Sequence, residues 1–156
     1  ELLEIPASVE VMDSAVMRAR GYLSLTEAVE SLPGVVSGES PAAPSSFSMR
    51  GFSRSQITIL RDGVWLGSAN MVMRPQNTFN LERVEVLRGP SSVLYGQGAV
   101  AGTVNAVTRS ASENSPQAFE VMASYGRYNT YQLGLGATGA IGDSVWYRNI
   151  AIRPRR

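Results

Sequence analysis

The feature that most constrains the fold is a two-residue alternation that begins after Arg109. Large apolar or aromatic residues return at every second position, while polar residues and glycines fill the positions between them. The alternating residues are Phe119, Val121, Ala123 and Tyr125, then Tyr131, Leu133, Leu135 and Ala137, and a third strand-like run spans residues 145–152. This pattern predicts antiparallel strands with one apolar face. It fits either the wall of a membrane β-barrel or an ordinary antiparallel meander.

Composition narrows the possible functions. The chain has 156 residues, of which 44% are hydrophobic, enough for one modest core. Its 14 basic and 13 acidic residues nearly balance, so nucleic acid is not the expected partner. Cysteine and histidine are both absent, which excludes thiolate metal sites and removes the commonest catalytic base. We therefore predict no catalytic residues, no metal site and no cofactor.

Targeting signals are also missing from the sequence. No apolar run approaches the roughly 18 residues of a membrane-spanning helix, and residues 1–7 do not resemble a signal peptide. From this alone we expect either a cytosolic protein or one whose targeting segment has been removed.

Residues before Arg109 mix short strands with a helix. Residues 8–12 alternate like a half-buried strand, and residues 13–21 form a polar connection. Apolar residues at positions 25, 28, 29 and 32 have helical spacing. Either Ser24 or Thr26 can cap this helix, and Pro33–Gly34 ends it.

Further short elements follow. Residues 47–52 and 56–60 are predicted strands, and Asp62–Gly63 is a turn that closes a hairpin. Residues 81–87 begin like a helical turn and end like a strand. The remaining expectations are loops at 37–46 and 67–79, a short helix at 91–95, a strand at 103–108 and a linker at 110–117.

Two motifs have the composition of functional sites. A nucleotide-binding glycine loop follows a strand and opens a helix. The glycine-rich segment 96–102 has the reverse order, because it follows the predicted helix at 91–95 and precedes the predicted strand at 103–108. Arg50, Arg61 and Arg88 each lie between an apolar run and a turn, where a guanidinium can meet a carboxylate on another surface. No nucleophile, base and orienting group share a recognisable spacing, so a soluble enzyme is the least favoured class.

An ordered set of motifs resembles the plug domain of TonB-dependent siderophore receptors. The set is Arg50-Gly51-Phe52, Asp62-Gly63-Val64, the segment NLERVEVLRGPSSVLYG at 80–96, and AGTVN followed by VTR within 101–109. Residues 5–9 and 25–35 match the opening strand and helix of that family in the same order. The resemblance covers nearly the whole chain.

The resemblance implies an α+β fold: a small mixed-sheet plug domain with short helices, followed by antiparallel strands. In such receptors the plug fills an outer-membrane barrel of about 22 strands, which would otherwise be an open channel. We accordingly expect the plug at residues 1–112. Residues 113–156 would be a linker and the first strands of an incomplete barrel.

The resemblance also implies site residues. Arg50, Trp65, Gly67, Ser68 and Phe79 match positions where such receptors contact their cargo. Aromatic faces and a guanidinium suit a bulky, anionic, oxygen-rich chelate such as a ferric siderophore. Iron would stay inside the chelator, so no protein ligand to the metal is required.

Other expected partners lie outside the chain. Arg61 and Arg88 resemble plug arginines that pair with barrel glutamates. The inner-membrane TonB protein grips an N-terminal box in this family, and no such box precedes Glu1, so this chain alone is not expected to couple to TonB. Cobalamin, haem or a saccharide stays open as cargo. A freestanding periplasmic module that binds partners through a sheet edge is the remaining alternative.

Overall fold

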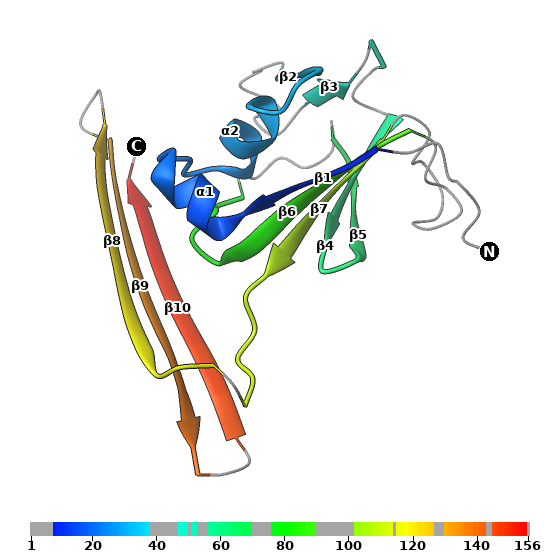
Figure 1. Cartoon of the computed structure of the whole chain (residues 1–156). Coiled ribbons are helices and arrows are strands. Elements are labelled where there is room, and N and C mark those ends of the chain that lie inside the picture. Colours follow the sequence, from blue (N-terminus) through cyan, green and yellow to red (C-terminus); the bar gives the residue numbers. More distant parts are fainter. Residues whose placement is uncertain are drawn as a thin grey trace, which may run out of the picture. The chain divides into compact units, whose positions relative to one another are not determined.

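The computed structural model divides the chain into two compact units, Glu1–Thr108 and Arg109–Arg156 (Figure 1). The residues it describes are 8–37, 47–49, 51–52, 56–69, 76–89, 102–113, 115–126, 130–142 and 145–155. Several expectations lie wholly or partly outside these ranges: the loop at 37–46 beyond its first residue, residues 70–75 of the loop at 67–79, the residue Arg50, the helix at 91–95 and most of the glycine-rich segment 96–102. Residues 37 and 67–68 belong to strands, so both loops begin later than predicted.

The first unit is built on a five-stranded mixed sheet with the order β1-β6-β7-β4-β5. The β4 and β7 strands pair in parallel, and the other neighbours pair antiparallel. A separate two-stranded ladder joins β2 and β3. The strands are β1 (Ser8–Asp13), β2 (Val35–Ser37), β3 (Phe47–Met49), β4 (Ile57–Arg61), β5 (Val64–Ser68), β6 (Leu81–Arg88) and β7 (Gly102–Thr108).

Helix α2 (Leu25–Glu30) forms where the apolar spacing predicted it. Ser24 is the capping residue: its side chain accepts a hydrogen bond from the Glu27 amide at 3.2 Å. The Glu27 carboxylate in turn accepts from the Ser24 amide at 3.3 Å, which completes a capping box. This pair satisfies backbone donors that the first turn would otherwise leave open.

Helix α1 (Ser14–Ala19) was not predicted, because the sequence there indicated a polar connection. Only Met17 of this short helix is buried. A helix held by one buried side chain gives no periodic apolar signal, so its sequence does not distinguish it from a loop.

The core of the first unit lies between the sheet and the two helices. Cross-strand register places Val84 opposite Ala106 and Val86 opposite Val104, so these side chains share one face of the sheet. Figure 1 shows α1 and α2 on one side of the sheet, beside β6. Met17, Leu25 and Val29 from the helices are at most 1% exposed and complete this core.

The β6 segment is a strand throughout, so the helical start predicted at residue 81 is wrong. Leu81 pairs with Thr108 and Arg83 with Val107, which leaves Glu82 as an extra residue in a bulge. The bulge lets Leu81 and Val84 both point into the core, three positions apart. That spacing imitates a helix, although the backbone is extended.

The second unit is a three-stranded antiparallel sheet in the order β10-β9-β8. Its strands are β8 (Ala118–Gly126), β9 (Thr130–Ile141) and β10 (Val145–Arg155), as the alternation predicted. Val121 pairs with Leu135, and Leu135 with Ala151, so the apolar positions share one face. Val121 is 65% exposed and Leu135 48% exposed.

None of the helices within the described ranges has the length and apolar character needed to cross a membrane.

Candidate functional site

The β4–β5 hairpin carries most of the described candidate cargo residues, and its turn is the predicted Asp62–Gly63 pair. Arg61 pairs with Val64, so the two residues between them form a two-residue loop. Both have positive φ, 51° at Asp62 and 78° at Gly63, as a type I′ turn requires. Aspartate tolerates this region and glycine adopts it freely, so the dipeptide fixes the hairpin register.

A polar network holds this turn against the sheet. The Gly63 amide donates to Asn105 Oδ1 at 3.1 Å, and Asn105 Nδ2 donates to Glu85 Oε2 at 3.0 Å. Arg83 Nε donates to the other Glu85 oxygen at 2.7 Å. The network therefore links the hairpin to β7 and β6 without using any residue of the proposed cargo surface.

The charges and hydrogen bonds in this network lower the pKa of the Glu85 carboxyl. Partial burial by itself would raise its pKa, but hydrogen bonds from Arg83 and Asn105 and the Arg83 charge outweigh burial, so the pKa lies below its ordinary value. The hydrogen bond to Glu85 correspondingly raises the pKa of Arg83. Glu85 thus stays ionised and keeps accepting both hydrogen bonds at neutral pH.

Strand β5 exposes an apolar edge. Val64 is 65% exposed, Trp65 60% and Leu66 45%, on a strand that ends the sheet order. Leu60 pairs with Trp65 and Ile59 with Gly67, so Leu66 is the extra residue of a bulge. Gly67 has φ of 140°, a backbone conformation that disfavours other residues. Exposed apolar side chains on an edge strand are a surface for contact with another molecule.

The predicted cargo residues do not all gather at one place. Ser68 pairs with Thr58, and Thr58 pairs with Thr103, at the end of the sheet where β7 begins. Phe79 instead precedes β6, whose first residue Leu81 pairs with Thr108 at the end where β7 finishes. Ser68 and Phe79 therefore lie at opposite ends of the sheet. Trp65 and Gly67 lie on β5 between the Asp62–Gly63 turn and Ser68.

The two candidate barrel-contact arginines differ in environment. Arg88 is 6% exposed and forms a bidentate pair with Glu10 of β1, through Nη1–Oε1 at 2.7 Å and Nη2–Oε2 at 2.5 Å. Its Nε is buried and has no hydrogen-bond partner within the described ranges. Arg61 is exposed and forms no ion pair with any residue that the structure describes. Sequence reasoning missed Glu10, because only the β1–β6 register brings it to Arg88.

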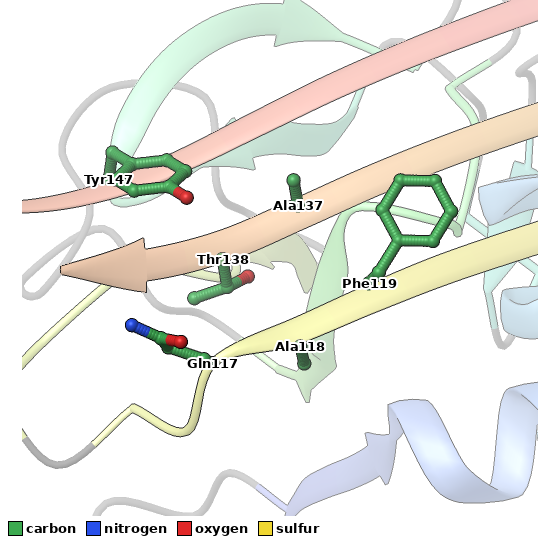
Figure 2. A pocket seen from close by; sticks show the side chains of 6 residues that line it. All are labelled: Gln117, Ala118, Phe119, Ala137, Thr138 and Tyr147. Carbon is green, nitrogen blue, oxygen red and sulfur yellow. The ribbon is translucent and has the colours of Figure 1, made fainter.

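The second unit has a shallow depression on its strands (Figure 2). Phe119 and Tyr147 rise on either side of Ala137, while Thr138 and Ala118 point away from the rings. The Tyr147 ring covers Gly139, where an added Cβ would come within 2.8 Å of the tyrosine hydroxyl oxygen. None of the predicted cargo residues lines this depression.

Among the described residues, no group of three or more His, Cys, Asp or Glu side chains is placed to hold a metal ion.

The fold and these features define a class: a small mixed-sheet domain joined to strands with one exposed apolar face. The family model of the TonB-dependent Receptor Plug Domain matches residues 1–103. The vitamin B12 transporter BtuB of Photobacterium profundum is 32% identical over 145 residues, covering 90% of this chain and 23% of the transporter. The catecholate siderophore receptor Fiu of Escherichia coli K12 is 29% identical over 148 residues, covering 90% of this chain and 16% of the receptor.

Structural comparison gives the same result. The closed form of the E. coli ferric-catecholate import receptor Fiu superimposes with a TM-score of 0.80 and 26% identity, covering 97% of this chain and 21% of that receptor. The chain thus belongs to the TonB-dependent receptor plug domain family, and the predicted fold is confirmed. Because the superposition includes the second unit, β8–β10 correspond to the first barrel strands, called the wall strands below.

Family membership also answers two broader predictions. The protein is part of a receptor of the cell outer membrane, and it is not an enzyme. The chain spans less than a quarter of the length of each relative named above.

Proposed function

We propose that this chain is the plug, with the first wall strands, of a receptor that binds a ferric siderophore and imports it. The observation that carries the proposal is the exposed Trp65 on an edge strand whose turn is fixed by its own polar network. A preorganised aromatic surface contacts a bulky chelate without first having to order itself. The catecholate receptor Fiu, similar in sequence and fold, supports this cargo class.

The cargo contacts are assigned to Arg50, Trp65, Gly67, Ser68 and Phe79. Because Ser68 and Phe79 lie at opposite ends of the sheet, a compact cargo that contacts Trp65 reaches only one of these two ends directly. The cargo would therefore contact either Trp65 and Ser68 or Trp65 and Phe79. Trp65 is expected to contact the cargo in both cases.

The test is cargo affinity in the full-length receptor. Replacing Trp65 by Ala is expected to weaken binding of a ferric catecholate by about 30-fold, the loss of one aromatic anchor worth about 2 kcal/mol. Phe119→Ala removes an aromatic side chain of comparable exposure, 71% against 60% for Trp65, from the wall strands and serves as the control. Unchanged affinity in both Trp65→Ala and Phe79→Ala would remove this surface from the cargo site.

Cobalamin is the second candidate cargo, because the BtuB relative is a vitamin B12 transporter. Titration of the receptor with a ferric catecholate, a ferric hydroxamate and cyanocobalamin separates the two candidates. Tight binding of cyanocobalamin alone would overturn the siderophore proposal and leave the receptor assignment intact. Haem and saccharide probes complete the set of open cargos.

The proposal also assigns a role to each part of the chain. Residues up to about 112 would act as the plug and the later residues as linker and wall, and the two compact units support a boundary in this region. Arg61, exposed in the plug, would pair with a barrel glutamate outside the chain. Arg88 would take the same role only by sharing its guanidinium between a barrel glutamate and Glu10, which already accepts hydrogen bonds from its Nη1 and Nη2.

Energy coupling would use the N-terminal side of the plug. Cargo binding would change the order of a peptide preceding the plug, and the TonB protein would grip that peptide. β1 is the first strand of the plug and an edge of its sheet, so the Glu10–Arg88 pair lies on the element nearest to that peptide. Cargo uptake that persists after deletion of the TonB protein would contradict this coupling.

A further inference from the structure

Arg109, the first residue of the second unit, is bound to a wall strand. Its Nη1 donates to both carboxylate oxygens of Glu120 on β8, at 2.8 and 2.9 Å. The side chains are 14% and 27% exposed, so water screens this pair less than an ion pair on the open surface. Arg109 is the first residue of the segment that connects β7 to β8, and Glu120 lies inside β8, two residues after that strand begins.

The same carboxylate also binds β10. Arg148 Nη2 donates to Glu120 Oε2 at 3.0 Å, and Arg148 Nη1 donates to Thr138 Oγ1 on β9 at 2.6 Å. Arg148 is 10% exposed. Glu120 therefore sits in a cluster that spans all three wall strands, and this cluster provides a fixed attachment point for Arg109.

The residue immediately before Arg109 is held within the other unit. The Asp62 carboxylate accepts from the Thr108 amide at 2.7 Å and from the Thr108 hydroxyl at 2.8 Å. Two consecutive residues are thus each held by a carboxylate of their own unit. The boundary between the compact units falls on the same peptide bond.

We propose that Glu120 is an anchor that keeps the connecting segment, residues 109–117, on the wall strands. The segment is then a closed loop with both ends on one sheet, and it is not a free tether. Closing a loop of this length costs little additional chain entropy, and charge-assisted hydrogen bonds are strong enough to offset that cost. Any movement of the plug against the wall would begin at the Thr108–Arg109 bond. This inference does not depend on the identity of the cargo.

A competing explanation is that the cluster only stabilises the strands. The two explanations differ in what Arg109 and Arg148 do. An anchor requires Arg109 and tolerates the loss of Arg148, since the Arg109–Glu120 pair would remain. A purely structural cluster would depend more on Arg148, which links β10 to β8 and β9.

The experiment is hydrogen exchange in the full-length receptor, read at the Ser112 and Ser115 amides. These amides are hydrogen-bonded within the segment, to Ser115 Oγ and to the Ser112 carbonyl, both at 2.9 Å. We expect Arg109→Gln and Glu120→Gln each to speed their exchange by roughly tenfold, as loss of a charge-assisted hydrogen bond would. Arg148→Gln should leave this exchange near its wild-type rate.

Two results would overturn the anchor. One is unchanged exchange in Arg109→Gln; the other is an equal acceleration in Arg148→Gln and Arg109→Gln. Heat-modifiable electrophoretic mobility confirms that each variant has a folded barrel. Should Glu120→Gln fail to fold, Arg109→Gln still decides the question, because it leaves Glu120 paired with Arg148.

Discussion

The two units use the same kind of strand in opposite ways. In the first, most large apolar side chains of β4, β6 and β7 are almost completely buried, and Val107 is the partly exposed exception. In the second, Phe119, Val121 and Leu135 remain 71%, 65% and 48% exposed, and every buried hydrophobic side chain among the described residues belongs to the first unit. The plug has its own core, whereas the wall strands need surroundings that accept an apolar face.

The largest expected effect tests the apolar face of the wall strands. Leu135→Arg should destabilise the full receptor by about 2–4 kcal/mol if that face meets lipid, because a charge is costly at the middle of a bilayer. The measurement is the yield of folded, heat-modifiable receptor in the outer membrane.

Gln132→Arg is the control for that experiment, since register places Gln132 on the opposite, polar face of β9. A similar loss in both variants would mean that the two faces do not differ as proposed, and the comparison between the units would fail.

A smaller loss of stability is expected inside the plug, where an ion pair joins β1 to β6. Glu10→Gln should weaken the attachment of β1 by about 2 kcal/mol, because it leaves the buried Arg88 guanidinium without its counter-charge. Hydrogen exchange of the β1 amides in the full receptor measures this loss.

Glu82→Gln is the control for Glu10→Gln, because it removes the same charge from an ion pair at the surface. Its pair with Arg83 is a surface one, with side chains 52% and 36% exposed, and should be worth about 0.5 kcal/mol or less. If the two variants loosened β1 equally, burial of Arg88 would not be what makes the Glu10 pair important.

The smallest effect is a pH dependence in the turn network. The folded-state pKa of Glu85 lies below the ordinary 4.5. The stabilisation that ionised Glu85 gives the plug is therefore fully present above pH 4.5. It is lost as pH falls through the lowered pKa, when the carboxyl takes up a proton. The measurement is plug stability from hydrogen exchange, corrected for the intrinsic effect of pH, in wild type and Glu85→Gln. A difference between them that did not shrink below about pH 4.5 would contradict the network.

The sequence determined the elements that depend on local chemistry. The Asp62–Gly63 turn and the strands of the second unit were predictable, because each rests on residues close together in the chain. The helix cap was narrowed to Ser24 or Thr26, and the structure shows that it is Ser24. The family was also predictable from ordered motifs, and the family model confirms it. Helix α1 was missed, because its single buried residue gives no repeating pattern.

Only the tertiary structure decided which distant residues meet. The pairing of Arg88 with Glu10, of Asp62 with Thr108 and of Asn105 with Glu85 follows from strand register, which no local pattern specifies. The bulge at Glu82 likewise follows from the pairing of β6 with β7. The physical reason is that propensities and turns act over a few residues, whereas register is set by burying one whole face of a sheet at once.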